Sequence, residues 1–202
     1  MATGFIEKVK GFLLDPTETL IAHKNEDLGD AIKYFITFLV IYGVLTGLML
    51  GLFMGMVGGM AGVEAGMGAL GAGGLAALGA AGMVIAAIIF IIIFGVFALF
   101  IAGILLHIFV FIAGGRKGIT TTIRALIYAL TPNLIFGWIP VIGLLAGFWS
   151  LALEILAIKE LHEISTTRAF VAVFLPAILL AVLMFFFLAA MVAATPATPY
   201  YY

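Results

Sequence analysis

Three ionisable side chains lie within long apolar stretches of this sequence, at His107, Arg124 and Glu154. Ionisable groups at membrane depth are costly, and in membrane proteins they often mark paths for protons or ions. Such groups also neutralise one another, reach up to the polar surface, or bind the headgroup of an anionic lipid. The sequence leaves these alternatives open. We treat the three residues as a candidate intramembrane polar cluster.

The composition indicates that hydrocarbon surrounds these groups. The chain has 202 residues, of which 65% are hydrophobic and 9% are charged, whereas a soluble domain has about 25% charged residues. No Asp, Glu, Lys or Arg occurs between Lys33 and Glu64, or between Glu64 and Arg116. Because about 20 apolar residues cross a bilayer as a helix, we expect an all-α fold, a polytopic integral membrane helical bundle.

Hydrophobicity and turn signals predict a single membrane domain at residues 33–193 with five spans. The spans cover residues 33–57, 84–112, 120–138, 141–159 and 168–192. A Gly/Ala-rich external loop, flexible or partly helical, is expected at 58–83, and an external tail at 194–202. All nine Lys and Arg residues then fall on one side, so the positive-inside rule predicts a cytoplasmic N-terminus and an external C-terminus. A sixth span would break this pattern.

The expected turn at residues 137–140 sets the depth of the polar residues. It folds the third span against the fourth, and Arg124 and Glu154 lie at about equal distances from it along the chain. At a rise of about 1.5 Å per residue the two side chains should be level, and His107 should reach a similar depth, roughly 10 Å from its helix end. The spacing therefore predicts that the three side chains can meet.

The first 32 residues are predicted to be a cytoplasmic amphipathic arm. Apolar residues recur there at helical spacing, at Phe5, Ile6, Val9, Phe12 and Leu13. The following Asp-Pro-Thr-Glu, residues 15–18, is typical of the start of a second short helix. These helices either pack on the cytoplasmic ends of the spans or present a face to a partner or to lipid.

A ladder of glycines runs along the first span at every fourth position: Gly43, Gly47, Gly51, Gly55 and Gly59. Glycines four apart lie on one face of a helix and let another backbone approach closely. The partner is either another span of the same chain, with the second span and its Gly95 as the candidate, or a second copy in a symmetric homodimer.

A helix break is expected in the third span at Pro132 and Asn133. Proline removes one backbone hydrogen bond of a helix and kinks it. The break is either a simple kink, which is common in membrane helices, or a substrate-coordinating break of the kind found in transporters.

Several function classes find no support in the sequence. There is no cysteine, the three histidines lack metal-ligand spacing, and no catalytic triad, phosphate loop or cofactor motif is recognisable. The string GAGGLA at 71–76 fits the letters of a dinucleotide fingerprint but follows no soluble strand. A net charge of −1 gives no overall attraction to nucleic acid. We expect no enzyme activity, cofactor or metal.

Three strings carry a family resemblance: FLLDPTETL at 12–20, ALIYALTPNLI at 125–135 and ILAIKELHEISTTRAFVAVFLP at 155–176. They resemble the Ypt/Rab-interacting-protein, or YIP, domain, over about residues 5 to 190. The resemblance implies a five-span helical membrane protein with a cytoplasmic N-terminus. Eukaryotic members are implicated in vesicle trafficking through Rab-type GTPases and through association with one another. This chain has a short arm and EDLGD in place of their Asp-Leu-Tyr-Gly-Pro motif, which is typical of a prokaryotic member and gives no support for a Rab-type partner.

The predicted function is that of a non-enzymatic membrane scaffold or adaptor. It would associate with itself or with other membrane proteins through its small-residue faces, and its cytoplasmic face would contact partners or anionic lipid. The alternative is a small channel, transporter or lipid-moving protein that uses the His107, Arg124 and Glu154 cluster. For a prokaryotic source, the plasma membrane is the expected location.

Overall fold

The computed structural model describes residues 4–62 and 70–194, and the regular structure of these residues is entirely α-helical. The helices are α1 (Phe5–Leu14), α2 (Pro16–Ala22), α3 (Leu28–Gly62), α4 (Leu70–Ile112), α5 (Ile119–Ala129), α6 (Thr131–Phe136), α7 (Ile142–His162) and α8 (Thr166–Ala194). The predicted all-α helical bundle is confirmed.

Within residues 4–62 and 70–194, five stretches are long and apolar enough to cross a membrane: Leu28–Phe53, Val84–Ile112, Ile119–Phe136, Ile142–His162 and Thr166–Ala190. The third combines α5 with α6. The number and order of the spans agree with the sequence pattern, because unbroken apolar runs of this length satisfy their backbone groups only as helices in hydrocarbon. The chain is a multi-pass membrane protein.

The segment expected as a loop at 58–83 is largely helical. Helix α3 continues to Gly62 and α4 begins at Leu70, so only residues 63–69, which lie outside the described residues, separate the two helices. Alanine and leucine are strong helix formers and outweigh the glycines in much of this segment. The helical alternative for this segment is therefore the one that its described residues adopt.

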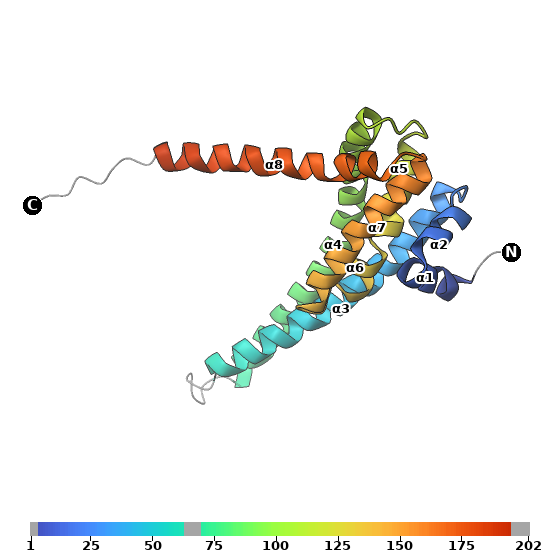
Figure 1. The fold of residues 1–202 in the computed structure, drawn as a ribbon. Coiled ribbons are helices and arrows are strands. Elements are labelled where there is room, and N and C mark those ends of the chain that lie inside the picture. The colour runs from blue at the N-terminus through green and yellow to red at the C-terminus, as the bar shows by residue number, and fades with distance from the viewer. Residues whose placement is uncertain (1–3, 63–69, 195–202) are drawn as a thin grey trace, which may run out of the picture.

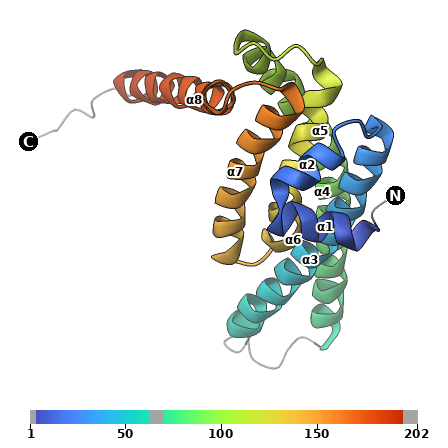
Figure 2. The same ribbon diagram turned by 45° about the vertical axis from the view of Figure 1, so that its right-hand side comes forward.

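Helices α3 and α4 form a long hairpin and lie side by side, as Figures 1 and 2 show. The span Ile119–Phe136 is the central one: 61% of it is buried, against 6% of the most apolar part of Val84–Ile112. The side chains of Tyr128 and Ile127 are completely enclosed. The third span is therefore the one against which the other helices pack, and few of the described residues of α4 are buried.

The arm packs against the bundle through a few side chains. Phe12 is fully buried and stacks on Tyr128 with 4.7 Å between the ring centroids, and Leu20 of α2 is buried as well. Other apolar side chains of the arm face outward, with Ile6 68% and Leu14 82% exposed. The arm thus has an inner face toward the bundle and an apolar outer face.

Helix α8 leaves the bundle. It contacts α4 and α7 near its start, and then points away from the other helices (Figures 1 and 2). Beyond Pro176, consecutive large side chains from Leu183 to Leu188 are all between 46% and 68% exposed. Most of this part of α8 is therefore exposed, and Leu179 and Leu183 border an apolar groove beside Leu105 and Phe109 of α4.

Candidate functional site

The glycine ladder begins as a contact within the chain. Gly43 and Gly47 are buried against α4. A Cβ atom at Gly47 would lie 2.6 Å from Cγ1 of Ile88, and one at Gly43 would lie 3.5 Å from Cγ2 of Ile91. Small residues at these positions let the two backbones approach closely. This end of the ladder packs against the second span.

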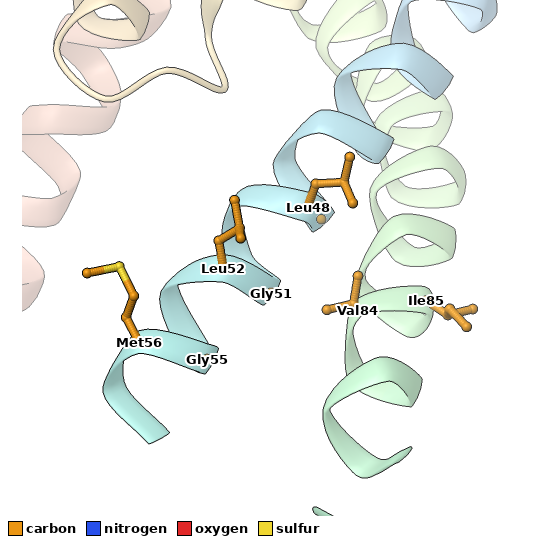
Figure 3. Close-up of a pocket in the computed structure, with 8 residues that line it drawn as sticks. Leu48, Gly51, Leu52, Gly55, Met56, Val84 and Ile85 are labelled. Atoms are coloured by element: carbon orange, nitrogen blue, oxygen red, sulfur yellow. The ribbon is translucent and has the colours of Figure 1, made fainter. Parts of the chain in front are cut away.

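The other end of the ladder is open. Gly51 is half-buried near Val84, whereas a Cβ atom at Gly55 would meet no other atom within 4 Å. The surroundings of Gly59 lie outside the described part of the chain. Gly51 and Gly55 lie on the side of α3 that faces α4, and Val84 points toward them (Figure 3). They line a groove of ≈ 710 Å³ together with Gly47, Leu48, Leu52, Met56 and Ile85.

The polar residues form a histidine chain that the sequence did not predict. His107 Nδ1 lies 2.8 Å from Oγ1 of Thr122, and this oxygen lies 3.0 Å from Nε2 of His162. The Thr122 hydroxyl has a single proton and can be the donor in only one of these two hydrogen bonds. In the other, an imidazole N–H must donate to the hydroxyl oxygen. This hydrogen-bonded chain joins α4, α5 and α7. His162 Nδ1 is buried without a hydrogen-bond partner in the described structure.

Arg124 binds backbone rather than a carboxylate. Its guanidinium donates hydrogen bonds to the carbonyl oxygens of Lys24 (2.9 Å) and Glu26, and one of 3.3 Å to the hydroxyl of Thr121. Two of these contacts bridge about a hundred residues of sequence, so hydrophobicity patterns could not reveal them. Arg124 therefore fixes the segment between α2 and α3 onto α5.

Glu154 is not part of this arrangement. It is half-buried on α7 and makes no hydrogen bond or ion pair within residues 4–62 and 70–194. A pair between Arg124 and Glu154, one of the alternatives that the sequence leaves open, is not formed among the described residues, where Arg124 donates to the carbonyls of Lys24 and Glu26 instead. His107, Arg124 and Glu154 are thus not joined into one cluster.

The third span breaks where proline predicts it. Helix α5 ends at Ala129 and α6 begins at Thr131, with Pro132 in its first turn. Two contacts hold the break: Oγ1 of Thr131 is hydrogen-bonded to the hydroxyl of Tyr34 at 3.0 Å, and the backbone N–H of Asn133 donates to Oγ of Ser150 at 3.1 Å. The break thus ties the third span to α3 and α7.

A partly buried ion pair joins the arm to the start of the first span. The ammonium group of Lys8 lies 2.6 Å from both carboxylate oxygens of Glu26, and Lys8 is 7% exposed. The hydroxyl of Tyr128 donates to the same carboxylate at 2.5 Å. Sequence reasoning missed Lys8, although it lies one helical turn before Phe12 and therefore on the same face of α1.

An exposed carboxylate links three segments at one end of the bundle. Glu163 forms ion pairs with Lys117, at 2.7 Å, and with Lys24. The hydrogen bonds from Lys117 and Lys24 lower the pKa of Glu163 to about 2. The carboxylate therefore stays ionised at neutral pH and connects the α4–α5 turn and the α2–α3 segment to the end of α7.

These helices define a multi-pass α-helical membrane protein with a central broken span and two short helices packed on the bundle. Residues 10–189 match the family model described as the Yip1 domain, so the chain belongs to the Yip1 domain family. The resemblance that the sequence motifs carry is thereby confirmed. Comparison with curated proteins and with solved structures gave no match.

Proposed function

We propose that this Yip1-domain protein is a non-enzymatic scaffold of the membrane that associates with a second copy of itself. The observation that carries the proposal is the open end of the α3–α4 groove, where a Cβ atom added at Gly55 would meet no atom of a neighbouring described element within 4 Å. In a bilayer, helices associate through close packing at small residues. A groove of ≈ 710 Å³ lined by glycines and apolar side chains suits another apolar helix rather than a polar solute.

The chain itself offers a helix of the required kind. Helix α8 beyond Pro176 is apolar, and most of its described large side chains are exposed. Each copy therefore has one open groove and one largely exposed helix. Two copies related by a two-fold axis can each insert α8 beside the partner's groove, which closes the assembly.

Energy transfer between donor- and acceptor-labelled copies in liposomes tests this proposal. The chain has no cysteine, so a Lys10→Cys substitution gives a single exposed labelling site. Gly55→Leu fills the groove without an internal clash, and we expect it to lower self-association by about tenfold or more with unchanged thermal stability. Each 1.4 kcal/mol of lost packing corresponds to about tenfold in affinity.

Gly47→Leu is the matched control. A side chain there collides with Ile88, so we expect a loss of thermal stability. If Gly55→Leu associates as strongly as the wild type, the groove is not the interface and the proposal fails. Equal instability of the two variants would also contradict it.

We further propose a cytoplasmic N-terminus, with the turn between α4 and α5 on the same side. The side chains of Arg116 and Arg168 are exposed and pair with no acid in the described part of the chain. These two guanidinium groups support a contact with anionic lipid on that side. An ion path finds less support, since Glu154 and Arg124 are not connected.

A further inference from the structure

The ammonium group of Lys8 lies in an enclosed cation site. Besides the two oxygens of Glu26, it faces two aromatic rings, with 4.8 Å to the ring centroid of Tyr34 and 5.0 Å to that of Tyr128. Aromatic faces attract cations at such distances, and aromatic cages with a carboxylate bind alkylated ammonium groups in many ligands. The site can therefore bind alkylammonium groups other than that of a lysine side chain.

The polar groups that line this site have partners in the bundle, whereas its two rings also pack on Phe12 of α1. The hydroxyl of Tyr128 donates to Oε2 of Glu26 at 2.5 Å, and the hydroxyl of Tyr34 bonds to Thr131 at 3.0 Å. Arg124 holds the backbone carbonyl of Glu26. The carboxylate and both hydroxyls thus have hydrogen-bond partners outside α1, and without Lys8 the partly buried carboxylate lacks its cation.

Helix α1 is held to the bundle by few side chains. Only Lys8 and Phe12 of its ten residues are buried. Its outer face exposes Ile6 and Leu14, and such apolar side chains gain free energy in the interfacial region of a bilayer. Helix α1 can therefore exchange its contacts with the bundle for contacts with lipid.

We propose that Glu26, Tyr34 and Tyr128 form a binding site for an alkylammonium group, which Lys8 fills in this structure and the amine headgroup of a membrane lipid fills when α1 is released. Glu26 lies two residues before the span that begins at Leu28, at the level where headgroups are found. An apolar groove of ≈ 380 Å³ lies at the end of α1, and it can take part of an acyl chain. Its lining comprises Leu13, Leu14, Pro132, Phe136, Ile142, Leu145, Ala146 and Trp149.

Rescue of a vacated site by a small amine tests the cation site. Lys8→Ala leaves Glu26 without its cation, and we expect the melting temperature in detergent to fall by about 6–20 °C, the effect of breaking a buried ion pair in a chain of this size. Ethylammonium should restore at least half of this loss, and sodium at equal ionic strength should not. Lys10→Ala, which removes an exposed lysine of the same helix, should lose little stability and gain nothing from ethylammonium.

Two results would overturn the cation site. One is a Lys8→Ala variant whose melting temperature responds to ethylammonium no more than that of Lys10→Ala. The other is rescue that persists when Glu26→Gln is added to Lys8→Ala, because the ammonium would then bind elsewhere.

Lipid retention by the wild-type chain tests the occupant and does not depend on the folding of any variant. The protein is prepared in micelles that contain equal amounts of phosphatidylethanolamine and phosphatidylglycerol. Native mass spectrometry then measures how much of each lipid stays bound. We expect preferential retention of phosphatidylethanolamine, and ethylammonium should displace this lipid but not phosphatidylglycerol. Equal retention of the two lipids, or no displacement by ethylammonium, would exclude an amine headgroup as the occupant.

Discussion

The guanidinium of Arg124 donates a 2.9 Å hydrogen bond to the backbone carbonyl of Lys24, a hundred residues earlier in the chain. This bond, with the one to Glu26, holds the segment between α2 and α3 against the central helix α5. The same segment provides the carboxylate that binds Lys8. Arg124 therefore stabilises the junction between the arm and the first span.

Removal of this guanidinium should loosen the junction. We expect Arg124→Gln to lower the free energy of unfolding by about 1.5–3 kcal/mol, the usual value for hydrogen bonds to a charged group. Arg124→Lys should recover only part of this loss, because an ammonium cannot reproduce the planar fork of donors. Chemical denaturation in mixed micelles measures both.

Arg168→Gln is the control, since the Arg168 side chain is exposed and makes no hydrogen bond or ion pair among the described residues. Its stability should match that of the wild type. An Arg124→Gln variant as stable as Arg168→Gln would contradict the role given to Arg124.

The hydroxyl of Thr122 should be needed for the contact between α4, α5 and α7. Thr122 is fully buried between His107 and His162. Thr122→Val keeps the volume but leaves ring nitrogens unpaired, so we expect a loss of about 1–3 kcal/mol in unfolding free energy. Thr122→Ser keeps the hydroxyl and should lose less. If Thr122→Val and Thr122→Ser have the same free energy of unfolding, the hydrogen-bonded chain does not contribute to stability.

The ion pairs of Glu163 should give stability that depends on pH. The pKa of Glu163 is lowered from 4.5 to about 2 by its hydrogen bonds to Lys117 and Lys24. The folded chain therefore binds this proton less readily than the unfolded chain, and the stabilisation is present above pH 4.5 and is lost as the pH falls toward 2.

Melting curves of the wild type and of Glu163→Gln, recorded between pH 7 and pH 3, measure the stabilisation by these ion pairs. We expect a small difference at neutral pH that shrinks on acidification and with added salt, because the pairs are exposed. A difference between wild type and Glu163→Gln that stays constant between pH 7 and pH 3 would contradict this assignment.

The sequence predicted the features that arise from local pattern. Unbroken apolar runs revealed the spans, and Pro132 revealed the break between α5 and α6. The spacing of Gly43 and Gly47 revealed a close helix contact. Each of these depends on neighbouring residues along one helix, which periodicity describes well.

Other contacts could not be read from local pattern. Arg124 lies opposite backbone carbonyls of a distant segment rather than opposite Glu154, and no side-chain pattern marks a carbonyl as a partner. Thr122 reads as an ordinary residue near the start of a span, and its role is visible only once α4 and α7 lie on either side of it. Tertiary packing decides such polar contacts.

The account depends most on a single arrangement, in which the arm and the α4–α5 turn lie on one side of the membrane and the α6–α7 turn on the other. Single cysteines in this cysteine-free chain test it, at the exposed positions of Lys10→Cys, Arg116→Cys and Val141→Cys. Labelling by a membrane-impermeant maleimide is compared in intact and in permeabilised cells that express the protein. We predict that Val141→Cys reacts in intact cells and that the other two react only after permeabilisation. Reaction of Lys10→Cys and Arg116→Cys from opposite sides would contradict the five-span arrangement.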